Sequence, residues 1–212
     1  MRFSTVHHVA NRGPEGGDDR VAVFGMDDHV VIAVADGAGG MGSGARAADA
    51  AIQHVRHRLD ASGKLEPQAI VRDADTAVRA AAHGGQTTLI LVVIDRSGVR
   101  GSSVGDSEAW IVRDGGVTRL TERQRRKPLL GSGEAVAVPF GAAPLDGTLV
   151  VGSDGLFKYT SAAKIAEAAR SPEVDGIPER LVDLVRLRSG SVPDDVAVVV
   201  CRADYGGAAV MR

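Results

Sequence analysis

Acidic residues recur at the ends of short apolar runs, a position from which they could bind metal ions. An aspartate at the end of a strand lies on the rim of a sheet, and carboxylates gathered on one rim repel each other unless a cation lies among them. Hard divalent cations such as Mg²⁺ or Mn²⁺ prefer oxygen ligands, and two of them can acidify a shared water into a hydroxide nucleophile. The acidic positions are Asp18-Asp19 before VAVF, Asp36 after VVIAVA, Asp106 after GSSVG, Asp154 after LVVGS and Asp194-Asp195 before VAVVV.

A single Asp-Gly after a strand is typical of a turn, so no one of these positions indicates a metal site by itself. The joint pattern does, because turns alone do not predict acids at the ends of so many apolar runs. Gly37 and Gly155 follow two of the acids and allow close approach of the backbone.

The predicted elements occur in the order strands, two helices, strands, two helices and a final strand. This order predicts an α+β fold, because a doubly wound fold would alternate strands and helices along the chain. Apolar runs at 21–24 and 30–35 predict a hairpin. The alanine-rich segment that follows predicts a helix over 43–59, with Ser43 as its N-cap. Glycine-punctuated runs then predict an antiparallel meander. The remaining predictions are a helix at 67–82, meander strands at 87–95, 99–104, 108–113 and 117–120, strands at 149–152 and 196–201, and helices at 161–169 and 177–188.

Length and composition exclude several classes of protein. The 212 residues predict a single domain spanning 1–212, and 44% hydrophobic residues are enough for a sizeable core. A net charge of −2 gives no basic surplus for nucleic acid. The lone cysteine, Cys201, cannot form an internal disulfide and is expected to be buried. No apolar run is long enough to span a membrane and the N-terminus lacks a signal-peptide pattern, so we expect a cytoplasmic protein.

The stretch 37–42 matches the G-x-G-x-x-G loop of dinucleotide-binding proteins, which is the main competing interpretation. Asp36 opposes it, because this carboxylate would face the incoming pyrophosphate. A second helix follows where a parallel strand should, and Asp60 falls at a helix end. A nucleotide binder would take NAD or FAD tightly without a divalent metal.

His54 and His57 lie one helical turn apart without nearby acids, and Trp110 is expected in the core.

Six short motifs carry a resemblance to a known family. The chain resembles the metal-dependent PPM/PP2C serine/threonine phosphatases, in a compact bacterial form, from about Asp18 to Cys201. Each fragment is weak alone, but all six occur in the family's order. They are GGDDRVAVF, VADGAGGMG, GGQTTLILVVI, VGDSEAWIVRDGG, SDGLFKYT and PDDVAVVV.

The resemblance implies a four-layer αββα sandwich of two antiparallel sheets flanked by helices, with two Mn²⁺ or Mg²⁺ ions at one end. Asp36 would bridge both ions and the Gly37 carbonyl would bind one. Asp154 and Asp194 would complete the second site, and Asp106 with Asp154 could take a weaker third ion. Asp18 and Asp19 would act near the first site, mostly through water. The implied catalytic residues are Asp36, Asp19 and a phosphate-binding Arg12.

The chain departs from the family pattern at several places. Glu108 stands where an arginine is usual, Asp195 where an asparagine is usual, and Ala38 where some members have histidine. Pro14 occupies the usual place of the phosphate-binding arginine, which makes Arg12 the nearest substitute. Only ERQRRKPL lies between Thr121 and Leu130, where most members carry a long flap, so we expect an open site.

The expected function is hydrolysis of phosphoserine or phosphothreonine by a metal-activated water, without a phosphoenzyme. The expected partners are a phosphorylated protein and a serine/threonine kinase, with no nucleic acid and no membrane, and the protein is expected to be a monomer. The basic loop RQRRK fits acidic or phosphorylated partners or, equally, a solvated loop. The motif departures leave open a degenerate phosphatase fold that acts as a binding or regulatory module.

Overall fold

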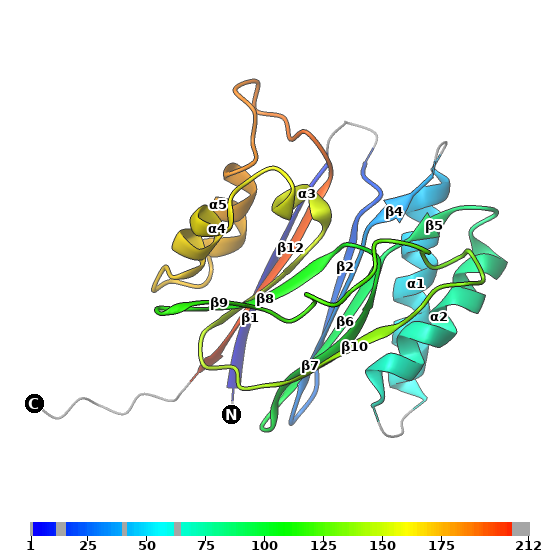
Figure 1. Cartoon of the computed structure of the whole chain (residues 1–212), viewed down its shortest axis with the longest axis horizontal. Coiled ribbons are helices and arrows are strands. Elements are labelled where there is room, and N and C mark those ends of the chain that lie inside the picture. The colour runs from blue at the N-terminus through cyan, green and yellow to red at the C-terminus, as the bar shows by residue number, and fades with distance from the viewer. Residues whose placement is uncertain (1, 12–15, 40–41, 62–64, 205–212) are drawn as a thin grey trace, which may run out of the picture.

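Two five-stranded antiparallel sheets pack face to face, with helices on both outer faces (Figure 1). The computed structural model describes residues 2–11, 16–39, 42–61 and 65–204. This architecture is α+β, with the layers helix, sheet, sheet, helix, and it confirms the predicted fold class.

Sheet I holds both ends of the described chain and is covered by the C-terminal helices. Its strands are, in spatial order, β1 (Arg2–Ala10), β12 (Val196–Asp204), β11 (Thr148–Gly152), β8 (Glu108–Arg113) and β9 (Gly116–Arg119). The covering helices are α3 (Asp154–Phe157), α4 (Ala162–Ala169) and α5 (Ile177–Asp183).

Sheet II is built from the middle of the chain and is covered by two longer helices. Its strands are, in spatial order, β10 (Val138–Ala143), β7 (Gly98–Val104), β6 (Leu89–Asp95), β3 (Val30–Ala35) and β2 (Arg20–Gly25). The helices are α1 (Ser43–Asp60) and α2 (Pro67–Ala81), and a short ribbon joins β4 (Gly37–Ala38) to β5 (Gln86–Thr87).

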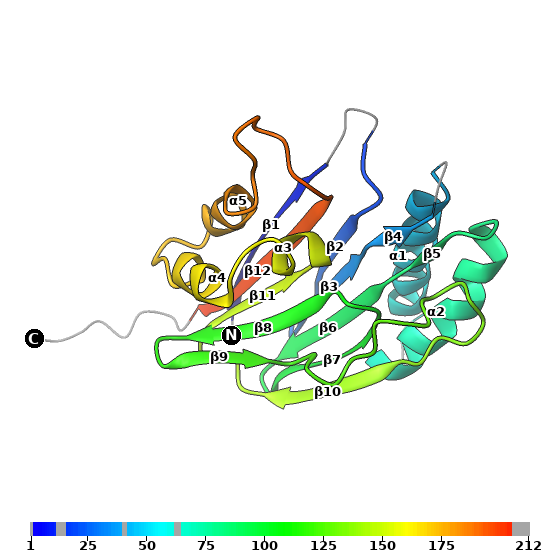
Figure 2. The same ribbon diagram turned by 45° about the horizontal axis from the view of Figure 1, so that its top comes forward.

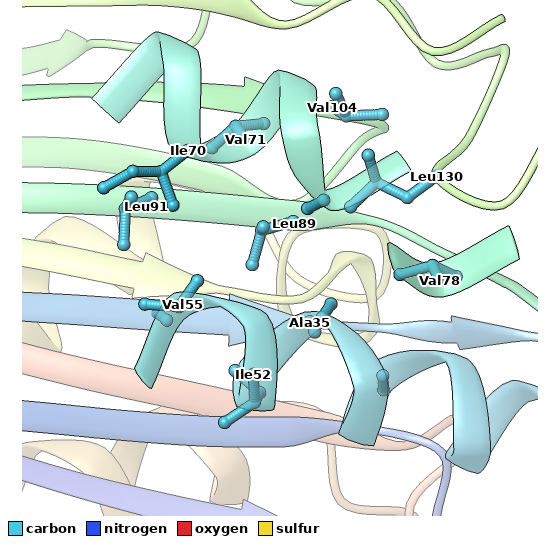
Figure 3. Close-up of a cluster of buried hydrophobic side chains, with 14 of the residues drawn as sticks. Ala35, Ile52, Val55, Ile70, Val71, Val78, Leu89, Leu91, Val104 and Leu130 are labelled. Atoms are coloured by element: carbon cyan, nitrogen blue, oxygen red, sulfur yellow. The ribbon is translucent and has the colours of Figure 1, made fainter. Parts of the chain in front are cut away.

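Strand alternation divides the apolar residues between the layers. In β3, Val31 and Ala33 face the helices while Ile32 and Val34 face the other sheet. In β12, Val198 packs beneath the C-terminal helices, and its neighbours on either side face sheet II. Figure 3 shows the layer between sheet II and its helices, where α1, α2 and β6 contribute only aliphatic side chains. The buried residues of this layer are therefore all aliphatic.

The predicted hairpin and long helices are confirmed, but the single meander is wrong. β6 and β7 pair in sheet II, whereas β8 and β9 pair in sheet I, so the chain changes sheets after Val104. The turn uses Gly105 at a φ of 92°. These strands are buried on both faces, so their pattern does not reveal which sheet each one joins.

Two helix boundaries also differ from prediction, and neither the short helix α3 nor strand β10 was predicted. Ser43 is not a cap, because Gly42 occupies the N-cap position at a φ of 71° and no side chain caps the helix. Helix α5 ends at Asp183 rather than 188, since the chain turns back at Gly190, where φ is 87°. β10 was not predicted from the sequence, because the proline and glycine in VPFGAA are unfavourable within a strand and are tolerated here at the edge of the sheet.

The structure also excludes the dinucleotide-binding interpretation. β3 is hydrogen-bonded to β2 and β6, both antiparallel, and α1 leads into α2 instead of a parallel strand. The βαβ unit that such a loop requires is therefore missing from this part of the fold. None of the helices in the described part of the chain is both long and apolar enough to cross a bilayer.

Candidate metal centre

The predicted acids all lie at one end of the sandwich. Antiparallel pairing places the start of β2 beside the end of β3, through Arg20 opposite Ala35. In sheet I, Gly152 at the end of β11 lies opposite the first residue of β8 and near the start of β12. The connections that carry the acids therefore emerge at the same rim, the end marked by α3 and β4 in Figure 2. These acids are Asp18, Asp19, Asp36, Asp106, Asp154 and Asp194.

Burial and repulsion between neighbouring acids raise the pKa values of three carboxyl groups on this rim. Burial, followed by repulsion from four other rim aspartates, raises the pKa of Asp36 to about 9. Burial likewise raises the pKa of Asp19 to about 7, against a hydrogen bond from Ser153 and with repulsion from Asp195, Asp154 and Asp194. The pKa of Asp154 is raised by burial and then by Asp106. Acids far apart in sequence therefore share one electrostatic environment.

This donor set fits hard divalent cations. The described residues contain no ready-made group of three acidic, histidine or cysteine side chains that could by itself hold an ion. Mg²⁺-type ions do not need such a cage, because they keep several waters and take one or two carboxylates. A divalent ion placed among these buried carboxyl groups would displace their protons and bind the carboxylates.

Asp36 is fixed through its backbone by two threonines. Its N–H donates to Thr88 Oγ1 at 2.9 Å, and its carbonyl accepts from Thr87 Oγ1 at 2.8 Å and from the Thr88 N–H at 2.9 Å. Both threonines are buried, and the hydroxyls of Thr88 and Ser107 lie 2.8 Å apart. The motif GGQTTLILVVI, which contains both threonines, therefore holds the backbone that presents the Asp36 carboxylate.

Gly37 lies where β4 crosses α1 at very close range. A Cβ on Gly37 would lie 2.3 Å from the Gly44 carbonyl oxygen, which no side chain tolerates. A Cβ on Gly44 would lie 2.8 Å from Asp18 Oδ2. The two glycines therefore allow the first helix to approach the loop of Asp18 and the carbonyl that the resemblance assigns to a metal ion.

Ser153 connects the two sheets at the centre of the rim, and sequence reasoning missed it. Its hydroxyl donates to Asp19 Oδ2 at 2.6 Å and accepts from the Ala197 N–H at 2.9 Å. Ser153 is completely buried and directly precedes Asp154. The serine in the SDG motif was the available signal, but a small hydroxyl residue is too common to stand out in a sequence.

Asp195 and Glu108 have structural partners in place of the family's usual residues. Asp195 Oδ2 accepts from the Asp18 N–H at 2.7 Å and so fixes the loop before β2. Glu108 Oε2 accepts from Trp110 Nε1 at 2.6 Å. Trp110 is buried against the Phe157 ring, with centroids 4.7 Å apart, as expected for a core residue.

Two basic side chains flank the acidic rim. Arg126 Nε lies 2.7 Å from Asp106 Oδ2, and Lys158 Nζ lies 4.0 Å from Asp194 Oδ2. Arg126 belongs to the basic loop RQRRK, for which the sequence analysis predicted no contact with these acids. Arg12, the predicted phosphate-binding residue, and Pro14 fall in a segment that the structure does not describe.

Comparisons with known proteins agree with this geometry. The model of the family "Stage II sporulation protein E (SpoIIE)" matches residues 26–204. The serine/threonine protein phosphatase PstP of Mycobacterium tuberculosis is 28% identical over 216 aligned positions, which cover 83% of this chain. The match covers 41% of PstP, so the chain spans about two fifths of that relative's length.

Solved structures share the fold. The catalytic domain of PstP in complex with two manganese ions superposes with a TM-score of 0.77 at 24% identity, covering 95% of this chain and 97% of that one. Stp1 from Staphylococcus aureus gives a TM-score of 0.81 at 16% identity, with 96% of each chain covered. At these identities the structural likeness establishes the fold.

Proposed function

The chain belongs to the SpoIIE family of PP2C-type phosphatase domains, and from this premise we propose that it is a metal-dependent serine/threonine protein phosphatase. The observation that carries the proposal is the convergence of Asp19, Asp36 and Asp154 at one rim, with pKa values raised by burial and by each other. A structural cluster would neutralise such acids with fixed basic groups, whereas a metal site leaves their charge for an ion.

The residues at the rim divide naturally between two ions. Asp36, the Gly37 carbonyl and, through water, Asp18 and Asp19 would hold one ion. Asp36, Asp154 and Asp194 would hold the other. When bound, two such ions supply an acidified water as nucleophile and stabilise the charge that builds on the phosphoryl oxygens.

The chain's own residues position these ligands. Thr87 and Thr88 fix the backbone of Asp36, and Ser153 holds the Asp19 carboxylate toward sheet I. Lys158 stands beside Asp194 with half of its side chain exposed, where it can attract a phosphorylated segment. The one cysteine, Cys201, is fully buried between the sheets, so it is not available as a nucleophile.

The wider setting follows from the relatives as part of this proposal. The PstP relative is called a serine/threonine protein phosphatase, so we infer a phosphorylated protein as substrate and a serine/threonine kinase as its counterpart. A single domain over 1–212, a monomeric state and a cytoplasmic location remain predictions from the sequence.

The test is release of phosphate from a phosphothreonine peptide by the purified chain, with Mn²⁺ and with EDTA. We expect turnover only with metal, and a loss of at least about a hundredfold in Asp36→Asn. Asp27→Asn is the matched control, because it removes one charge from the exposed β2–β3 turn. Equal rates for Asp36→Asn and wild type would refute the proposal, and absence of any turnover would favour the binding-module alternative.

A further inference from the structure

The short segment between Thr121 and Leu130 lies beside the acidic rim, and it is fixed at both ends. At its start, Thr121 Oγ1 accepts from the Ala109 N–H at 3.2 Å. At its end, Leu130 exchanges two backbone hydrogen bonds with Thr87, at 3.0 and 3.1 Å. The segment is therefore held in place by sheet I on one side and, on the other, by the threonine that fixes Asp36.

A buried carboxylate strengthens the second attachment. Asp75, on α2, is 7% exposed and accepts three backbone hydrogen bonds from the chain just beyond Leu130. Its Oδ1 accepts from the N–H groups of Gly131 and Gly133 at 2.6 and 3.2 Å, and its Oδ2 accepts from Ala135 at 3.1 Å. Both ends of the segment are therefore anchored by buried residues.

Arg126 is the residue of this segment that reaches the acids. Its Nε lies 2.7 Å from Asp106 Oδ2. The Asp106 side chain is 28% exposed and the Arg126 side chain 72%, so the guanidinium covers the carboxylate from the solvent side. Asp106 faces the rest of the rim, because its charge acts on both Asp36 and Asp154.

We propose that the Arg126 guanidinium is the resident cation at Asp106 and competes there with the further ion that Asp106 and Asp154 could bind. The inference rests on the proposed metal-dependent function and assigns a role to one residue within it. The guanidinium is hydrogen-bonded to one of the two oxygens of the carboxylate for which a third ion would compete. A divalent ion placed about 5 Å from it would also be repelled, which weakens binding by about tenfold in water.

The test measures metal stoichiometry rather than turnover. Mn²⁺ binding is titrated by calorimetry and by native mass spectrometry for wild type, Arg126→Gln and the double variant Arg126→Gln/Asp106→Asn. Arg125→Gln is the matched control, because it removes the same charge from an exposed neighbour in the segment. Arg126 is itself largely exposed, so all variants should fold, and circular dichroism verifies this.

We expect two tightly bound ions in wild type and in Arg125→Gln. Arg126→Gln should bind a third Mn²⁺ about tenfold more tightly than wild type does, and the double variant should lose that gain. A third ion bound equally well by wild type and Arg126→Gln would overturn the inference while leaving the proposed function intact. Wild type that binds no Mn²⁺ would overturn both.

Discussion

Replacing Asp36 by asparagine should stabilise the metal-free protein while destroying its response to metal. The pKa of the Asp36 carboxyl is raised from 3.8 to about 9, so the folded chain holds a proton there that the unfolded chain releases. Between about pH 4 and pH 9 the folded state therefore binds more protons, and its stability falls as the pH rises through that window. Asparagine removes this cost because it carries no charge in either state.

The shift sets the size of the effect. One pKa unit corresponds to 1.36 kcal/mol, so a shift of about five units gives a ceiling of about 7 kcal/mol. Asp36 is only partly buried, and its neighbours would relax, so we expect a gain of about 1–3 kcal/mol at pH 8. For a chain of this length that is an increase of about 3–9 °C in Tm.

The assay is thermal unfolding in EDTA and in Mn²⁺ at pH 5 and pH 8, with Asp27→Asn as the control for loss of one exposed charge. Asp36→Asn should melt higher than wild type in EDTA, by more at pH 8 than at pH 5, and Mn²⁺ should raise its Tm far less than that of wild type. This prediction fails if Asp36→Asn has a lower Tm than wild type in EDTA at pH 8. It also fails if Mn²⁺ raises the Tm of the variant as much as it raises that of wild type.

Three further substitutions test the supports of the site. Ser153→Ala removes the hydrogen-bond donor to Asp19 and should lower the free energy of unfolding in urea by about 1–3 kcal/mol, and calorimetry should show weaker Mn²⁺ binding. An unchanged urea midpoint would contradict a stabilising role for this buried hydrogen bond. Gly37→Ala places a Cβ 2.3 Å from the backbone of α1 and should lower stability by more than about 2 kcal/mol, whereas Gly25→Ala, which meets nothing within 4 Å, should not. Asp75→Ala leaves three backbone N–H groups without their acceptor and should cost about 2–4 kcal/mol, with faster hydrogen exchange confined at first to the segment after residue 130.

The layers and the acidic rim could be predicted because they depend on strong local signals. Apolar strands bounded by aspartates fix where each strand ends, and antiparallel pairing then brings alternate ends to one rim. The order of Asp36, Asp106 and Asp154 along the chain was enough to suggest that they meet. The confirmed αββα fold shows that the short motifs carried most of this information.

The parts that sequence reasoning missed depend on contacts between distant segments. Ser153 and Thr88 are small hydroxyl residues whose importance comes only from what lies opposite them. For Arg126 the sequence left a partner-binding loop and a solvated loop equally open, and only the folded chain pairs it with Asp106. The assignment of β6 and β7 to one sheet and of β8 and β9 to the other could not be predicted either. Strands that are buried on both faces have no sequence pattern that identifies the sheet they join.

The most direct measurement is a crystal structure of the chain soaked in Mn²⁺, with anomalous differences recorded at the manganese edge. We predict two manganese peaks at the rim, both against the Asp36 carboxylate, with Asp154 and Asp194 beside one of them. Manganese absent from that rim at saturating concentration, or bound only at surface acids elsewhere, would contradict it.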